Sequence, residues 1–215
     1  ADGEGRPDKA GSYLRHGLLL NLIIAAFIFI LVLVFSQFTH MLGQEAEVEQ
    51  LAQPYLLIIS SSIFPFILFL TYKQFAEGLS FTRVAMIVSI GANLLNIFFN
   101  YLLIYGNWGL PALGLNGAGY ATLMARILMA VFMSLYIFKG KHFKKYLRHY
   151  KSITWTRSYF RDILRVGVPS GTQYIFEISA FAVAAVFVGQ ISAEALAAHQ
   201  IAISLAALSY IMASG

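Results

Sequence analysis

The sequence predicts an all-α, polytopic membrane helix bundle, and three observations support this fold class. Of the 215 residues, 59% are hydrophobic and 12% are charged, and the mean hydropathy is +0.70. Soluble domains average about 45–50% apolar and about 25% charged residues. Six apolar stretches approach the roughly 20 residues that cross a bilayer as a helix, and basic residues are almost confined to alternate loops. A barrel would instead need alternating strands of about ten residues.

The six predicted spans are 17–38, 52–72, 84–105, 116–138, 166–189 and 195–214. Pro65 lies inside the second span and Pro169 near the start of the fifth. Each proline frees a backbone carbonyl and so permits a kink, and the serines at 60–62 suggest a locally polar helix beside Pro65. Gly114, Gly117 and Gly119 are expected to allow a turn and close helix packing at the start of the fourth span.

The loops alternate in charge, which predicts the orientation of the chain. The three loops 39–51, 106–115 and 190–194 contain no Lys or Arg, and the first carries three glutamates. The other loops and the segment before the first span carry every basic residue except Arg126, which lies within a span. By the positive-inside rule, the basic loops are expected on the cytoplasmic side.

The longest basic loop, 139–165, mixes its cations with aromatic residues that include Tyr146, Tyr150, Trp155, Tyr159 and Phe160. Basic and aromatic residues together can bind nucleic acid, but beside two spans they favour an interfacial segment on an anionic leaflet. Membrane lipids are therefore expected as partners, and nucleic acid is not. This loop is also the one plausible boundary between two halves of the protein.

Glu177 lies in the middle of the fifth span, where a carboxylate costs roughly 2.5–3.5 kcal/mol on insertion scales. Gln173 and Phe181 are one helical turn away on the same face, and Tyr174 is adjacent. Such a carboxylate could bind Na⁺, take a proton, or attract a cationic ligand that also stacks on the aromatic rings. The alternative is a static buried pair with Arg126, which would argue against cation coupling at Glu177.

Asn93, Asn96 and Asn100 recur at three- and four-residue spacing on the third span. They indicate either a cavity wall with cation ligands or interhelical hydrogen bonds, each worth about 0.6 kcal/mol. The chain has no cysteine, and His199 has no second ligand at metal-binding spacing, so no transition-metal site is expected. No nucleophile–base pair, phosphate loop or dinucleotide fingerprint is present. The sequence therefore indicates no enzyme, no catalytic residues and no cofactor.

Several short segments of the chain form a recognisable series. In the last third these are GVP at 167–169, Gln173, Glu177, Phe181, Gly189 and LAAHQI at 196–201. Further pieces are ADGE at 1–4, AGSYLRHG at 10–17, FAEGLSFTR at 75–83 and GLNGAGYAT at 114–122. Together they resemble the multidrug and toxic compound extrusion (MATE) family, in particular its NorM-like branch. Their order and spacing cover essentially the whole chain. Arg126 has no counterpart in this pattern.

The resemblance implies a fold of twelve helices in two six-helix lobes, of which this chain would hold helices three to eight. Residues 1–138 would then complete the N-terminal lobe, 139–165 would be a cytoplasmic linker, and 166–215 would begin the C-terminal lobe. Glu177 would match the acidic residue that helps bind the coupling cation. Both ends of the chain look cut, so a longer protein is expected.

The leading hypothesis is a Na⁺- or H⁺-coupled antiporter that exports organic cations and drugs across the bacterial plasma membrane by alternating access. Its site would use Glu177, with Gln173, Tyr174, Phe181, Asn93, Asn96, Asn100 and Arg126 as cavity candidates. The resemblance implies a monomer. The alternatives are a lipid-linked precursor flippase of the same superfamily, for which Arg126 is the available base, and a non-transporting membrane scaffold. The sequence does not distinguish Na⁺ from H⁺ or identify the substrate.

Overall fold

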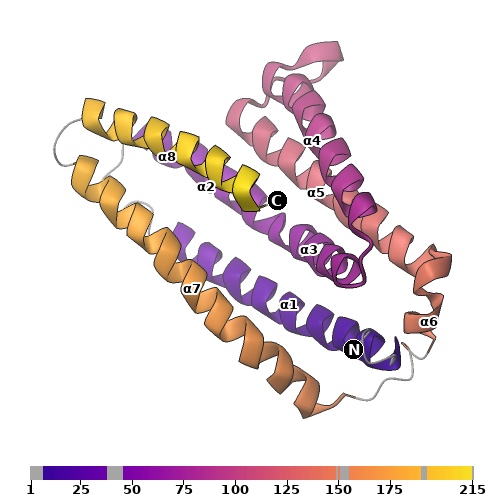
Figure 1. Ribbon diagram of the computed structural model, residues 1–215. Coiled ribbons are helices and arrows are strands. Elements are labelled where there is room, and N and C mark those ends of the chain that lie inside the picture. The colour runs from indigo at the N-terminus through magenta and orange to yellow at the C-terminus, as the bar shows by residue number, and fades with distance from the viewer. Residues whose placement is uncertain (1–6, 38–45, 149, 151–154, 190–192, 215) are drawn as a thin grey trace. The chain divides into compact units, whose positions relative to one another are not determined.

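The computed structural model describes residues 7–37, 46–148, 150, 155–189 and 193–214, and the described residues form helices without strands (Figure 1). The fold class expected from the sequence is therefore confirmed. The chain divides into two compact units, residues 1–160 (unit 1) and 161–215 (unit 2). The α-helices are α1 (Pro7–Ser36), α2 (Ala46–Ser61), α3 (Ile63–Gly78), α4 (Thr82–Tyr105), α5 (Gly114–Lys139), α6 (Lys144–Leu147), α7 (Arg157–Gly189) and α8 (Ala193–Ser214), with short 3₁₀ helices η2 (Asn107–Gly109) and η3 (Lys141–Phe143).

Four described segments are long and apolar enough to cross a membrane, namely Lys9–Ser36, Gln50–Gly78, Thr82–Tyr105 and Gly114–Lys139. They coincide with the first four spans expected from the sequence. Large apolar side chains on these helices are exposed, including Phe27 and Ile97, each 65% exposed. A soluble protein would bury such a surface, whereas lipid accepts it. The exposed apolar helices are therefore consistent with a bilayer around unit 1.

The last two expected spans coincide with α7 and α8. Within the described residues of α7 and α8, the apolar segment Ala197–Ala207 is shorter than a membrane span. That these two helices cross the membrane therefore stays a prediction. Helix α7 begins at Arg157, nine residues before the expected start of the fifth span. The additional turns carry Arg157, Arg161 and Arg165 at four-residue spacing, so they extend the helix beyond its apolar part.

The second span is two helices rather than the single helix expected over 52–72. The kink was expected at Pro65, whereas the interruption lies three residues earlier, at Ser62. Pro65 has no N–H to donate to the carbonyl of Ser61, one turn earlier. In addition, the hydroxyls of Ser60 and Ser61 donate to the Leu57 carbonyl at 3.0 and 2.8 Å. This competition for backbone acceptors weakens the backbone hydrogen bonds of the helix just before Pro65, and the helix breaks at Ser62.

Helices α4 and α5 form a hairpin whose turn and contact both depend on glycine. Gly106 ends α4 with a φ of +71°, a left-handed conformation that favours glycine. A Cβ on Gly117 would lie against the carbonyl of Leu103, 2.6 Å from its carbon. Gly119 approaches α2 in the same way, since its Cβ would be 3.0 Å from Ile58 Cγ2. The expected close packing is confirmed at Gly117 and Gly119. No heavy atom lies within 4 Å of a Cβ on Gly114, whose φ of +53° fits the expected turn.

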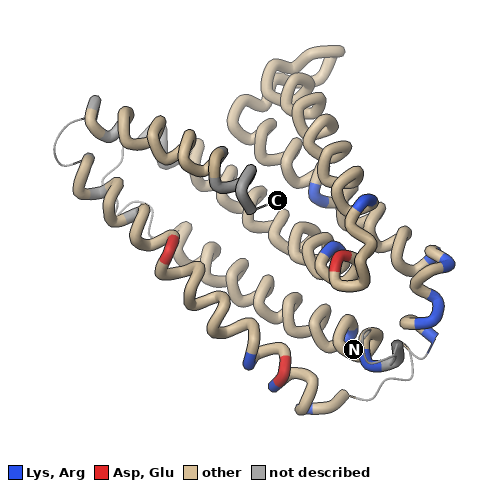
Figure 2. The backbone as a smooth tube through the Cα atoms, in the orientation of Figure 1, with Lys and Arg blue, Asp and Glu red and all other residues tan. Residues whose placement is uncertain are grey.

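The buried core of unit 1 gathers toward one end of the bundle, which we call the basic end. This end comprises the start of α1, the end of α3, the start of α4, the end of α5, and α6. Figure 2 shows Lys and Arg concentrated around α6 and the adjoining helix ends. Beneath these charges lies a cluster that includes Leu14, Phe69, Met133, Ile137 and Phe143, of which the last three are fully buried.

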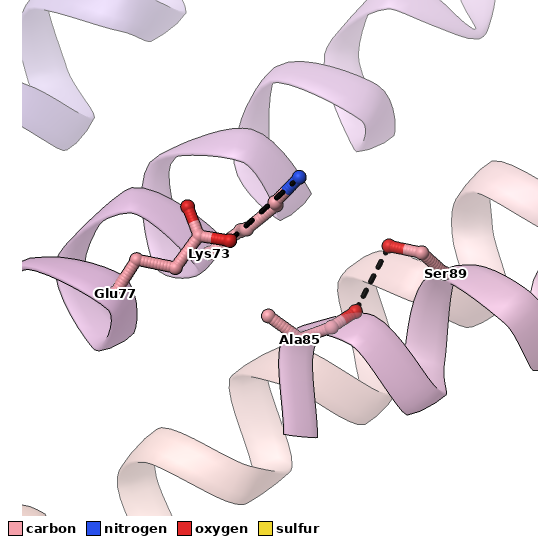
Figure 3. A network of polar contacts seen from close by, with 4 residues as sticks. All are labelled: Lys73, Glu77, Ala85 and Ser89. Carbon is pink, nitrogen blue, oxygen red and sulfur yellow. Dashed lines mark hydrogen bonds and ion pairs between the residues drawn. The ribbon is translucent and has the colours of Figure 1, made fainter. Parts of the chain in front are cut away.

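The turn between α3 and α4 belongs to the basic end. Lys73 Nζ is 3.8 Å from Glu77 Oε1, one turn along α3 (Figure 3). Ser89 Oγ donates to the Ala85 carbonyl at 2.9 Å in the neighbouring α4 (Figure 3). Both partners of the ion pair are partly exposed, so the pair contributes little to stability.

The linker after α5 packs back onto the bundle. Tyr146 of α6 is only 3% exposed and, with Tyr150, contacts the core cluster. Sequence reasoning placed these rings in an interfacial segment, whereas in the structure Tyr146 and Tyr150 contact protein. Burial raises the pKa of Tyr150, with a further increase from Tyr72 and an opposing effect of Arg15. The Tyr150 hydroxyl therefore stays neutral in this environment.

Arg15 and His16 of α1 hold the linker on both sides of residues 151–154. Arg15 Nη1 donates to the Tyr150 carbonyl at 3.0 Å, and its guanidinium lies 4.6 Å from the Trp155 ring centroid. His16 is fully buried, with Nδ1 2.7 Å from the Ser12 carbonyl. The Thr156 N–H donates to His16 Nε2 at 3.0 Å. Both contacts are satisfied by the neutral tautomer that carries its proton on Nδ1.

We expect His16→Ala to release the linker from α1. The substitution removes both hydrogen bonds and the ring contacts with Trp155, Tyr159 and Phe160. Since each buried hydrogen bond contributes about 1 kcal/mol, trypsin should cleave after Arg148 and Arg157 several-fold faster. The matched control is His142→Ala, because His142 is exposed. Equal cleavage rates in the two variants would show that His16 does not hold the linker.

Candidate functional site

Arg126 of α5 contacts the break between α2 and α3. Its Nη1 donates to the Ser62 hydroxyl, which in turn donates to the Ile59 carbonyl at 2.6 Å. The guanidinium carbon lies 4.5 Å from the ring centroid of Phe66, in α3. Arg126 is half-buried and Ser62 is fully buried. The arrangement places one positive charge inside the span, at the point where the second span is interrupted.

These contacts explain how the chain tolerates an arginine at this depth. The Phe66 ring attracts the cation through its π face, and a hydrogen bond from a charged donor contributes about 1.5–3 kcal/mol. Together they offset part of the insertion cost of the guanidinium. Sequence reasoning noted the serines and Pro65 but did not connect them to Arg126. The available signal was the coincidence of an intramembrane base with three consecutive serines in a neighbouring span.

We expect the Arg126–Ser62 bond to appear as coupling between the two positions. Ser62→Ala should lower the thermal midpoint of the purified protein in detergent, because it leaves an intramembrane guanidinium without its hydroxyl partner. In an Arg126→Leu background the same substitution should have little further effect, giving a coupling of about 1–2 kcal/mol. Ser61→Ala, whose hydroxyl bonds only within α2 among the described contacts, is the control. Additive effects at 62 and 126 would contradict the contact.

The second group of candidates lies on α7, in unit 2. Glu177, Gln173, Tyr174 and Phe181 are all exposed, with Tyr174 at 64% and Phe181 at 54%. Residues 173, 177 and 181 follow one another at four-residue spacing, so the helix presents them as one stripe. The stripe has an amide, a carboxylate and aromatic rings on a helix that the sequence predicts to span the membrane. Such a stripe can supply oxygen ligands to Na⁺, hold a proton, or attract an organic cation.

The hypothesis of a static Glu177–Arg126 pair joins residues of different units. Within unit 1, the described partners of Arg126 are the neutral groups of Ser62 and Phe66. Arg126 therefore has local contacts with neutral groups that offset part of the cost of its burial. The pairing itself stays a prediction, as does the role of Glu177.

The asparagines of α4 are only partly brought together. Asn100 Nδ2 donates to Asn96 Oδ1 at 3.1 Å, a bond within α4 rather than between helices. Asn93 is exposed. In the described part of the chain, the buried Oδ1 atoms of Asn100 and Asn116 have no hydrogen-bond partner. Sequence reasoning did not include Asn116, and its place beside Gly117 in the tight α4–α5 hairpin was the available signal.

One interhelical polar contact in unit 1 was not foreseen. Asn21 Nδ2 of α1 donates to Thr71 Oγ1 of α3 at 2.8 Å, and Thr71 Oγ1 donates to the Ile67 carbonyl at 2.8 Å. Hydrogen bonds of this kind hold transmembrane helices together. Neither Asn21 nor Thr71 belongs to a series of polar residues at helical spacing, so no sequence pattern indicated this pair.

Three comparisons place the chain among known proteins. The family model described as MatE matches residues 1–102. The probable multidrug resistance protein NorM of Oceanobacillus iheyensis is 30% identical over 200 residues, which are 93% of this chain and 45% of that protein. The NorM protein of Photorhabdus laumondii is 31% identical over 214 residues, 100% of this chain and 46% of that protein. The chain thus spans less than half the length of these relatives.

A solved structure described as the inward-facing conformation of a multidrug resistance MATE family transporter of the MOP superfamily is similar in fold. Its TM-score is 0.68 at 25% sequence identity, over 78% of this chain and 37% of that one. Sequence similarity along the whole chain and structural similarity over most of it agree with the motifs at both ends of the sequence. The expected family resemblance is therefore confirmed: over nearly all of its length the chain is similar to transporters of the MATE family.

Proposed function

We propose that the intact protein is a multidrug exporter that couples the entry of Na⁺ or H⁺ to the efflux of organic cations. The observation that carries this proposal is the similarity to NorM multidrug resistance proteins along nearly the whole chain. Two lobes would expose a shared cavity to either side of the membrane in turn. Since this chain spans under half of its relatives, transport is a property of the intact protein.

The coupling cation would bind at Glu177. The carboxylate lies within an apolar stretch of α7, where a charge persists only if it is paired, protonated or holding a cation. Gln173 would add an amide oxygen, and Tyr174 and Phe181 would present aromatic faces to an organic cation. Asn93, Asn96, Asn100 and Arg126 would line the cavity from the N-terminal lobe. No cofactor, catalytic residue or nucleic-acid partner belongs to this proposal.

The protein would act as a monomer in the plasma membrane of a bacterium. The basic loops, including the 139–165 linker, would face the cytoplasm, because positively charged loops are retained on that side. A cysteine introduced in the linker should then react with a membrane-impermeant thiol reagent in inverted vesicles and not in intact cells. The 215 residues of this chain contain no cysteine, so any cysteine elsewhere in the intact protein is first replaced by serine.

The transport proposal is tested with the intact protein in inverted membrane vesicles. A fluorescent cationic dye is followed before and after a Na⁺ step, and separately under a proton gradient. We expect at least one gradient to accelerate dye movement relative to vesicles without the protein. If neither gradient moves the dye, the antiporter proposal is wrong.

A flippase for lipid-linked precursors is the second candidate, and Arg126 is the observation that favours it. An intramembrane guanidinium can bind a pyrophosphate group. Translocation of a fluorescent lipid pyrophosphate by the reconstituted protein, without movement of the cationic dye, would select this function. A protein that moved neither substrate would fit the membrane scaffold, a role that should also tolerate Glu177→Gln without phenotype.

A further inference from the structure

We propose that η3 and α6 form a binding surface for the headgroups of anionic glycerophospholipids, with Lys141, Lys144 and Arg148 as its cations. This surface lies in unit 1, apart from the α7 residues of the proposed cation site. The inference is independent of which substrate the intact protein transports.

The segment has two chemically distinct sides. Lys141, Lys144 and Arg148 are exposed and follow each other at three- and four-residue spacing, which brings successive side chains onto one face of a helix. The opposite side carries Phe143 and Tyr146, which are 0% and 3% exposed. The bundle therefore occupies the aromatic side and leaves the cationic side open.

The aromatic side packs against the bundle, which fixes the backbone that carries the three cations. The Phe143 ring centroid lies 5.1 Å from that of Phe81 and 5.2 Å from that of Tyr136. A Cβ on Gly11 of α1 would collide with the Tyr146 carbonyl, so the α1 backbone passes directly against α6. The segment is thus part of the core of unit 1. Less backbone freedom therefore remains to be lost when a ligand binds.

The charges on this surface lack acidic neighbours in the sequence. No Asp or Glu occurs between Glu77 and Asp162, a stretch that contains the whole of η3 and α6. Like charges one turn apart repel each other by about 0.2–0.5 kcal/mol per pair. Lys145 differs from the other three, since its ammonium lies 4.6 Å from the Tyr146 ring centroid. An external anion would remove the repulsion between the remaining cations.

The position of η3 and α6 beside a membrane span indicates that the anion bound by these cations is a lipid headgroup. Lys141 follows the last residue of the α5 span, Lys139, by two positions, so the surface begins where the hydrocarbon region ends. A cluster of Lys and Arg directly beside a membrane span attracts anionic headgroups, and the attraction decays within a Debye length of the surface. A phosphodiester oxygen is a suitable acceptor for both ammonium and guanidinium groups.

The proposal is tested with the intact protein in bilayers that mix phosphatidylcholine and phosphatidylglycerol. Electron paramagnetic resonance of spin-labelled lipids gives the preference of the protein for phosphatidylglycerol over phosphatidylcholine. We expect the triple variant Lys141→Gln, Lys144→Gln, Arg148→Gln to lose most of this preference. The loss is about fivefold per cation if each contributes fully, or on the order of a hundredfold together.

Two further variants keep the test specific. The triple variant Arg157→Gln, Arg161→Gln, Arg165→Gln removes the same charge from α7, where Asp162 interrupts the basic run, and should lose clearly less of the preference. The exchange Lys141→Arg, Lys144→Arg, Arg148→Lys keeps the charges and should retain the preference. Circular dichroism and the accessibility of a linker cysteine check that each variant folds with unchanged orientation.

Three results would overturn the proposal. Equal lipid preference in the wild type and in the η3–α6 triple variant would show that these cations do not bind headgroups. Equal loss in both triple variants would show a general response to positive charge. Nucleic acid that copurifies with the wild type but not with the η3–α6 variant, without lipid preference, would assign the surface to a different polyanion.

Discussion

Glu177→Gln is expected to abolish cation-coupled dye transport while leaving the intact protein folded. Glutamine retains the size and one oxygen of glutamate but carries no charge and takes no proton in this range, so neither Na⁺ binding nor protonation can drive the cycle. The predicted rate in inverted vesicles falls to the level of vesicles without the protein, under both Na⁺ and proton gradients. Thermal stability should be unchanged or higher, since removing a charge from an apolar span lowers its insertion cost.

The matched control is Glu77→Gln. Glu77 is also a carboxylate on a span, but it lies near the end of α3, is partly exposed and pairs with Lys73. Its loss should reduce transport by no more than about twofold, because surface ion pairs contribute about 0–1 kcal/mol. If Glu177→Gln transports as the wild type does, Glu177 is structural. If both variants fail equally, the defect is not specific to the proposed cation site.

Gly117→Ala is expected to destabilise unit 1 by forcing α4 and α5 apart. The new Cβ would overlap the Leu103 carbonyl, and this obstacle is backbone, which cannot rotate away as a side chain can. Helices α4 and α5 would have to separate, at a cost of about 1–3 kcal/mol from overpacking. The thermal midpoint of the purified protein in detergent should fall by several degrees.

Gly91→Ala provides the contrast within the same hairpin. No heavy atom lies within 4 Å of a Cβ placed there, and alanine is the better helix former by about 1 kcal/mol. Gly91→Ala should therefore leave the thermal midpoint unchanged or raise it. A fall of the same size in both variants would mean that a methyl group destabilises the hairpin at either glycine, and that the α4–α5 contact at Gly117 does not determine the result.

The sequence was sufficient for most of the helical framework because the bilayer restricts the alternatives. A long apolar stretch must form a helix, so α4 and α5 begin and end within two residues of the expected spans. The residues at which α1 and α7 begin were harder to predict. Both helices begin with turns that precede the apolar stretch and contain no apolar run. These turns carry Arg15 in α1, and Arg157 and Arg161 in α7.

The sequence could not identify the neighbours of the intramembrane polar residues. Arg126 was recognised as exceptional, but its contact with Ser62 depends on how α5 packs against the break between α2 and α3. Glu177 was identified by depth and family resemblance, and its proposed role still rests on both. Burial of Tyr146 was also unpredictable, since an aromatic ring beside lysines can face either lipid or protein.

The closure of the basic end has a consequence for biosynthesis. Arg15 bonds to a residue 135 positions later in the chain, and the first turns of α1 pack against Phe143 and Tyr146. At about 5–20 residues per second, the ribosome needs on the order of ten seconds to produce that partner after α1 has emerged. During this interval α2 and α3 can already pack on α1, but the part of α1 that α6 covers has no native neighbour. We expect an insertase or chaperone to bind the start of α1 until α6 has been synthesised and completes the core.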